Sequence, residues 1–321
     1  MSDSHGAYYI PEPSRWPIVG TLALFTIFVG GGMMLNGYVG SGQYVLGLGF
    51  LALIYLFYGW FKDVIDESLA GNYNEQVDIS FRWGMAWFIF SEVMFFAAFF
   101  GALFYIRVLS VPWLGGDSVT NTFAWPDFQA AWPLLTTPDM SVAGLETKYM
   151  AIKDVIPAWG VPAANTAILL TSGATVTFAH WALKKGSRSG LCWWLAATVA
   201  LGFFFVYLQA LEYGHAYHEL DLTLESGVYG STFFMLTGFH GFHVTMGATM
   251  LLIILYRSMK GHFSAHNHFA FEGVAWYWHF VDVVWLGLFV FVFIFFLPDR
   301  IAGLIKPTAP ALKKLRLFIV L

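Results

Sequence analysis

Seven long apolar windows constrain this chain more than any other feature of its sequence. Each is bounded by charged residues or by Gly and Pro, and each is long enough to cross a hydrocarbon core as a helix, which takes about 20 residues. The windows are Pro17–Asn36, Gly42–Phe61, Phe81–Val108, Pro162–Leu183, Leu191–Glu212, Gly227–Tyr256 and Phe271–Leu297. We therefore predict an all-α, polytopic membrane protein with seven transmembrane helices.

The composition excludes the main alternatives. Only 11% of the 321 residues are charged and 58% are hydrophobic, whereas soluble domains carry about 25% charged residues. So few charges cannot cover a soluble globule of this length. A net charge of −4 gives no basic surface for nucleic acid. The single cysteine, Cys192, excludes an internal disulfide and every multi-cysteine metal site.

The connections between the windows indicate how the chain crosses the membrane. They are short except for residues 109–161, where the density of Trp and Pro favours an ordered segment near the lipid headgroups. The first window lies too deep in the chain for a cleaved secretory signal. We find no internal repeat, which argues against a proton-coupled transporter of the inverted-repeat type. Lys and Arg gather before the first window and after the second, fourth and sixth, which predicts a cytoplasmic N-terminus and, across seven spans, a C-terminus on the outer side of the membrane.

Glu92 is the clearest polar residue inside a window. An acid near the bilayer centre costs about 2.5–3.5 kcal/mol on insertion scales, so its presence needs a reason. Phe88, Phe95, Phe96 and Phe99 share its face at helical spacing. Two interpretations stay open from the residues alone. Glu92 is either a carboxyl that exchanges protons or anchors a lipid or subunit, or a neutral acid that hydrogen-bonds to an adjacent helix.

Histidines form two pairs with i, i+3 spacing, His215 with His218 and His240 with His243. Such pairs can ligate a metal, and a histidine on another helix could complete a haem site. More often such histidines are imidazoles that hydrogen-bond across helices, which the glycines of the sixth window favour by bringing backbones close together. We predict no metal site here, and assign His240 and His243 to a structural polar network.

Two further groups of polar residues have two interpretations each. His279 and Asp282, at i, i+3 in the last window, form a proton relay or a pair that satisfies itself, and we assign them to the same structural polar network. Arg257 and His262, with Lys260 between them, make a cationic cluster that binds lipid phosphates or is a solvated helix end.

Long polar and aromatic strings in five blocks carry a resemblance to a known family. The blocks are Trp60–Glu67, Arg82–Phe100, Asn165–His180, Glu225–Gly247 and His268–Trp285. Together they resemble subunit III of the haem-copper cytochrome c oxidases of bacteria and mitochondria. The resemblance covers about residues 15–297 and is weak in the long connection 109–161.

The resemblance implies a particular organisation of the seven helices. The first two, over 17–61, are splayed from a five-helix bundle, over 81–297, by a cleft filled with phospholipid. A cytoplasmic segment, 1–16, precedes them, and a cytoplasmic connection, 62–80, joins the two units. The tail 298–321 has no counterpart in the family that we recognise.

The resemblance also implies a function for the chain. It would be a non-catalytic subunit of a proton-pumping oxidase in the bacterial inner membrane, which takes electrons from cytochrome c and reduces oxygen to water. Its main partner would be subunit I, with subunit II as a second, and these carry the haems and the copper. This chain would carry no redox centre and would stabilise subunit I and support proton uptake. Subunit III of a quinol-oxidising relative is an alternative, and a histidine-ligated membrane metalloenzyme is a further one.

Residue roles follow from the same resemblance. Glu92 matches the family's intramembrane carboxyl, which faces the cleft. Bound phospholipids would contact Trp60, Phe61, Glu67, Glu92, Arg257 and His262. No residue of the chain is expected to be catalytic.

Overall fold

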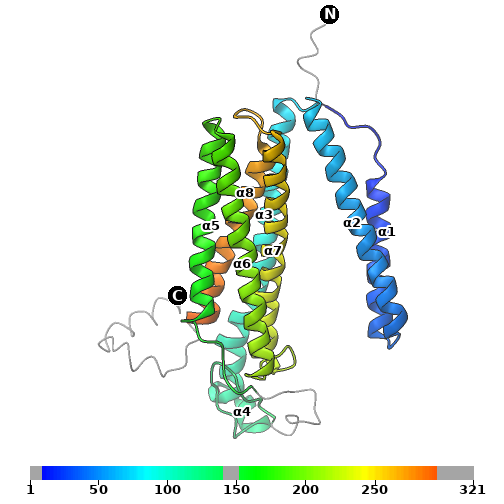
Figure 1. The fold of residues 1–321 in the computed structure, drawn as a ribbon. Helices are drawn as coiled ribbons and strands as arrows, with labels where there is room; N and C mark the ends of the chain where they lie inside the picture. Colours follow the sequence, from blue (N-terminus) through cyan, green and yellow to red (C-terminus); the bar gives the residue numbers. More distant parts are fainter. Residues whose placement is uncertain (1–8, 140–151, 295–321) are drawn as a thin grey trace, which may run out of the picture. The chain divides into compact units, whose positions relative to one another are not determined.

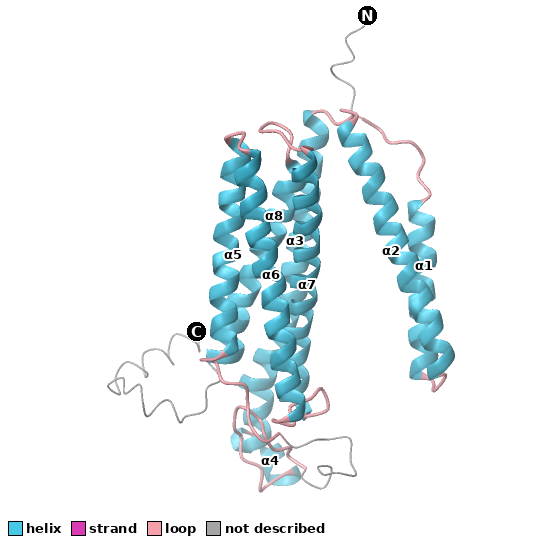
Figure 2. Ribbon diagram, in the orientation of Figure 1, coloured by secondary structure: helices cyan, strands magenta, loops and turns pink. Residues whose placement is uncertain are grey.

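The computed structural model describes residues 9–139 and 152–294, and within these ranges the chain forms helices and loops but no strand (Figure 2). Seven helical segments of the described residues are long and apolar enough to cross a membrane. The prediction of an all-α protein with seven spans is therefore confirmed. The tail 298–321, the end of the last window and part of the long connection lie outside the described residues.

The chain divides into two compact units, and the boundary falls between Gly84 and Met85. This boundary lies inside a continuous helix, α3 (Glu75–Phe104). Each unit is described by itself, and the lipid-filled cleft that the resemblance implies between them stays a prediction.

The first unit is built around a helical hairpin of α1 (Trp16–Leu35) and α2 (Val39–Leu69) (Figure 1). The two backbones meet closely along a glycine seam on α2. A Cβ built on Gly49 would lie 2.7 Å from the backbone nitrogen of Ile27, so only glycine fits there. Near the open end of the hairpin, Trp16 is 3% exposed and donates its indole N–H to Asp63 at 2.7 Å. Small residues thus let two apolar helices pack in lipid.

Helices α2 and α3 extend well beyond the apolar windows that predicted them. Residues 62–80, expected as a connection, are helical except for a short turn that ends at Asn74. Ion pairs at i, i+4 support the added turns, with Lys62 and Asp66 at 3.0 Å and Arg82 and Asp78 at 2.7 Å. Apolar windows mark the part of a helix that suits hydrocarbon, whereas the helix itself continues into the polar region.

The second unit contains the rest of α3 and four further long helices: α5 (Val161–Lys184), α6 (Arg188–His218), α7 (Gly227–Lys260) and α8 (Phe269–Leu288). Figure 1 shows the four as a bundle. At its centre Trp278 and Trp285 are almost fully buried. Their indole N–H groups donate to Ser172 and Thr166 of α5, both at 2.9 Å. Buried Trp therefore fills the core and also links α8 to α5.

Irregular helical segments follow α3 and α8. Residues 105–110, 113–117 and 289–294 are π-helical, and a short helix, α4 (Val119–Ala124), follows the second of them. The side-chain amide of Asn121 donates to the backbone carbonyls of Leu114, Trp125 and Phe128. One side chain thus holds together much of the described start of the long connection.

Candidate functional site

Glu92 and His243 meet inside the second unit. The carboxyl of Glu92, on α3, lies 2.9 Å from Nε2 of His243, on α7, although the two residues are 151 positions apart in sequence. Their side chains are 21% and 9% exposed. The structure thus provides Glu92 with a specific partner on a neighbouring helix, and that partner is one of the histidines expected to be structural.

The other ring nitrogen of His243 determines how protons are arranged in this pair. Nδ1 lies 2.6 Å from the backbone carbonyl of Phe239, which can only accept, so Nδ1 carries a hydrogen. In a neutral ring Nε2 is then an acceptor, and the bond to Glu92 needs a proton on the carboxyl. In a charged ring Nε2 donates to the carboxylate. In both arrangements the Glu92–His243 bond holds one proton, which can lie on either side.

Aromatic rings surround the pair. Phe96 is 2% exposed and meets the His243 ring edge to face at 5.0 Å between centroids, while Phe95 lies at 6.0 Å. Tyr277 of α8 stacks on His243 at 6.3 Å. In such a low-dielectric setting the hydrogen bond between Glu92 and His243 is stronger than in water. Phe95 and Phe96, two of the phenylalanines expected near Glu92, thus line this site.

His240, one turn before His243 on α7, has a different environment. It is fully buried, and its Nε2 lies 3.1 Å from the backbone carbonyl of Val281, so Nε2 carries the hydrogen. Its ring packs against Phe205 and Trp285. The i, i+3 pair on α7 therefore does not converge on one point, because each histidine bonds to a different helix.

His279 and Asp282 face one another on α8, with Nδ1 and Oδ2 at 3.7 Å. Asp282 is buried, whereas the side chain of His279 is 47% exposed. Gly173 of α5 makes room for the carboxyl, because a Cβ there would lie 2.5 Å from Oδ2. The pair predicted from the i, i+3 spacing is thus present. It joins a buried carboxyl, that of Asp282, to a half-exposed imidazole, that of His279.

Residues expected to bind lipid lie in both units. In the first, Trp60 and Phe61 expose 51% and 58% of their surface. Glu67 accepts a hydrogen bond from the phenol of Tyr73 at 2.7 Å. Partial burial, and next the bond to Glu67, raise the pKa of Tyr73. The rings of Trp60 and Phe61 are thus open to an outside contact, whereas Glu67 has a partner within the unit, and the contact of all three with lipid stays a prediction.

The cationic cluster at the end of α7 contains one buried residue, Arg257, beside the exposed Lys260. Arg257 is 7% exposed and its guanidinium lies over the ring of Phe263 at 4.7 Å. His262 follows the helix, and partial burial, followed by the charges of Arg257 and Lys260, lowers its pKa. Arg188, at the start of α6, donates to two backbone carbonyls in the last turn of α7, those of Ser258 and Met259. Arg257 and Arg188 therefore both support this end of the bundle.

Three residues that were not grouped from the sequence meet at this same end of the bundle. They are His180 of α5, His268 before α8 and Glu272 of α8. The Nε2 atoms of the two histidines and Oε1 of Glu272 lie 3.2–3.3 Å from one another. The i, i+4 spacing of His268 and Glu272 was a visible signal. The third member was not predictable, because the sequence does not tell which point of α5 lies against the start of α8.

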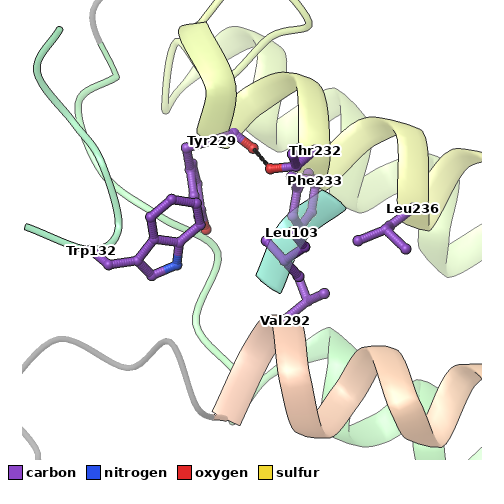
Figure 3. Close-up of a pocket in the computed structure, with 7 residues that line it drawn as sticks. All are labelled: Leu103, Trp132, Tyr229, Thr232, Phe233, Leu236 and Val292. Atoms are coloured by element: carbon purple, nitrogen blue, oxygen red, sulfur yellow. Dashed lines mark hydrogen bonds between the residues drawn. The ribbon is translucent and has the colours of Figure 1, made fainter. Parts of the chain in front are cut away.

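A small cavity lies elsewhere in the second unit, among Leu103, Trp132, Tyr229, Thr232, Phe233, Leu236 and Val292 (Figure 3). Its volume is about 10 Å³, roughly that of one water probe. The hydrogen bond drawn there, from the hydroxyl of Thr232 to the carbonyl of Tyr229, is internal to α7. This cavity is a packing defect rather than a ligand site.

The fold and the paired polar residues define a seven-span helical membrane protein with ionisable groups buried between its helices. The sequence profile of the family described as Cytochrome c oxidase subunit III matches residues 5–118 and 119–297. The chain belongs to this family, and it is thus a subunit of cytochrome c oxidase, an oxidoreductase complex.

Individual relatives agree with this assignment. Cytochrome c oxidase subunit 3 of Prototheca wickerhamii is 40% identical over 287 residues, which cover 89% of this chain and 96% of the relative. The subunit 3 of Oncorhynchus mykiss is 38% identical over 91% of this chain and 98% of its own length. That of Arabidopsis thaliana is 39% identical over 89% and 96%.

Proposed function

We propose that this chain is a non-catalytic subunit III of a proton-pumping oxidase that passes electrons from cytochrome c to oxygen. It packs against subunit I as its main partner and subunit II as a second, and these carry the haems and the copper. The family match and the relatives' shared name support the parent activity. The single cysteine supports the placement of the copper chemistry elsewhere, because a paired-thiolate copper site needs two. We place the complex in the bacterial inner membrane, with the N-terminus cytoplasmic and the C-terminus periplasmic.

The observation that carries a role in proton handling is the Glu92–His243 hydrogen bond. A carboxyl and an imidazole that share one proton can pass it from one partner to the other without breaking the contact between α3 and α7. The Glu92 side chain is 21% exposed, so the pair lies at the surface of the second unit rather than deep in its core. Subunit III would in this way keep a proton available to the complex during turnover.

The test replaces Glu92 by Gln in the assembled oxidase. The amide keeps the size and can still donate to Nε2 of His243, but it cannot release a proton. We expect proton uptake to slow several-fold, or the number of turnovers before inactivation to fall, while the haem absorbance spectrum of the complex is unchanged. Infrared difference spectroscopy should show the loss of one protonated-carboxyl band.

A matched control is Glu219→Gln. Glu219 also pairs with a histidine, His215, at 3.1 Å, but its side chain is 69% exposed. This variant should behave as the wild type. If Glu92→Gln leaves both proton uptake and working lifetime unchanged, Glu92 has the structural role of joining α3 to α7.

We further propose that the chain binds phospholipid at both of the places described above, through the exposed rings of Trp60 and Phe61 and through the basic residues around Arg257. Arg257→Ala should reduce the phospholipid phosphorus retained per purified complex, and Arg257→Lys should retain more of it, because the positive charge is kept. Equal phosphorus in the wild type and both variants would assign Arg257 to structural support of the α7 end alone.

A further inference from the structure

The histidine and glutamate cluster at one end of the five-helix unit has the geometry of a metal site. Nε2 of His180 lies 3.3 Å from Nε2 of His268, and each lies 3.2 Å from Oε1 of Glu272. The three atoms thus form a nearly equilateral triangle. Ligands of a tetrahedral zinc ion, at about 2.0–2.1 Å from the metal, are about 3.3–3.4 Å from one another. The separations within the cluster are therefore those of one face of a zinc tetrahedron.

The protonation of His268 leaves one side of this triangle without a hydrogen. Nδ1 of His268 lies 3.0 Å from the carbonyl oxygen of Ser264, so Nδ1 carries the hydrogen. In the neutral ring Nε2 then presents a lone pair toward Oε1 of Glu272, which is also an acceptor. Two acceptors at 3.2 Å repel one another unless a cation lies between them. A proton can serve one side of the triangle, whereas a metal ion serves all three corners at once.

The Ser264 carbonyl also meets a second requirement of metal sites. A ligating histidine usually donates its other ring nitrogen to a carbonyl or carboxylate, which fixes the tautomer and the direction of the ring. His268 already has this support. Burial is suitable as well, because the side chains of His180, His268 and Glu272 are 24%, 8% and 12% exposed. The site is thus enclosed but remains within reach of an ion from solvent.

We propose that His180, His268 and Glu272 bind a divalent transition-metal ion of the zinc class. Imidazole nitrogen favours zinc, copper, iron and nickel over magnesium and calcium, and zinc suits the triangular face with one carboxylate. The ion would join the end of α5 to the start of α8, which lie at the same end of the bundle (Figure 1). The proposed metal site differs from the expectation, made from the sequence, that this chain holds no metal. Zinc is not a redox centre, so the proposed function does not depend on this site.

The test measures zinc in the intact oxidase complex. The complex is purified, treated with a chelator, titrated with zinc chloride and separated from free metal, and bound zinc is counted per complex by mass spectrometry. We expect the wild type to retain one equivalent that His268→Ala and Glu272→Gln lose. His215→Ala is the matched control, because His215 also pairs with a glutamate but is 45% exposed, and it should retain the equivalent.

Equal zinc in the wild type, His268→Ala and Glu272→Gln overturns the proposal, and so does an equal loss in His215→Ala, which would indicate general binding by histidines. A second measurement needs no variant. The zinc X-ray absorption spectrum of the loaded wild-type complex should show a shell of nitrogen and oxygen at about 2.0–2.1 Å with scattering from two imidazoles. A spectrum without imidazole scattering rejects these ligands even if the variants fail to assemble.

Discussion

The hairpin of α1 and α2 and the bundle of the second unit achieve helix packing by different means. In α1 only 11% of the apolar window is buried within the protein, against 61% in the span Phe269–Ile294, which contains α8. The hairpin depends on glycines that let two backbones approach, whereas the bundle depends on large buried rings with polar links such as Trp278 to Ser172. Lipid is as apolar as a leucine side chain, so close packing and hydrogen bonds stabilise helix pairs where hydrophobic burial contributes little. The two regions should therefore respond to different substitutions.

The largest effect is expected in the bundle, from Trp278→Ala. Trp278 is fully buried and fits against Gly202 of α6 and Gly247 of α7. Its truncation leaves a cavity and removes the partner of Ser172, so we expect a loss of about 3–5 kcal/mol in unfolding free energy. Denaturation of the purified complex in SDS measures this. Trp193→Ala is the control, because Trp193 is 76% exposed and should cost little.

A smaller but specific effect is expected in the hairpin, from Gly49→Leu. The new side chain would meet the backbone of Ile27, which cannot move aside without separating α1 from α2. We expect a cost of about 1–3 kcal/mol, typical of overpacking. Gly47→Leu is the matched control, because a Cβ on Gly47 has nothing within 4 Å. If both variants are equally stable, close packing at Gly49 does not hold the hairpin together.

The sequence predicted the seven spans because apolar length is a local property, and the same holds for the pair His279 and Asp282 on one helix. It did not predict that Glu92 bonds to His243, since the two are 151 positions apart and their meeting depends on how α3 lies against α7. The grouping of His180 with His268 and Glu272 was missed for the same reason. Arg257 was expected to bind lipid phosphate or to lie at a solvated helix end. It is instead buried over Phe263, because its long side chain can fold back onto an aromatic ring.

The smallest effect is expected where the first unit uses a polar link outside the apolar windows. Tyr73→Phe removes the hydrogen bond to Glu67, at 2.7 Å, and leaves the ring contacts with Tyr9 and Phe81 in place. We expect a loss of about 1 kcal/mol, the usual net value of one hydrogen bond. The hydrogen bond from Trp278 to Ser172 in the bundle is buried, whereas the bond from Tyr73 to Glu67 is only partly buried.

The pH dependence of the stability difference between the wild type and Tyr73→Phe tests whether the Tyr73 phenol is its source. The folded-state pKa of Tyr73 is raised above its unfolded value because of burial and the neighbouring Glu67. A phenol with a raised pKa contributes its full stability below the unfolded pKa, about 10, and loses it as the pH rises through the folded value. The stability gap between the wild type and Tyr73→Phe should thus be constant at neutral pH and begin to shrink as the pH rises past about 10, as measured by SDS denaturation across the alkaline range. A gap that already shrinks between about pH 7 and 9 would contradict a protonated Tyr73 as its source, because this phenol stays protonated throughout that range.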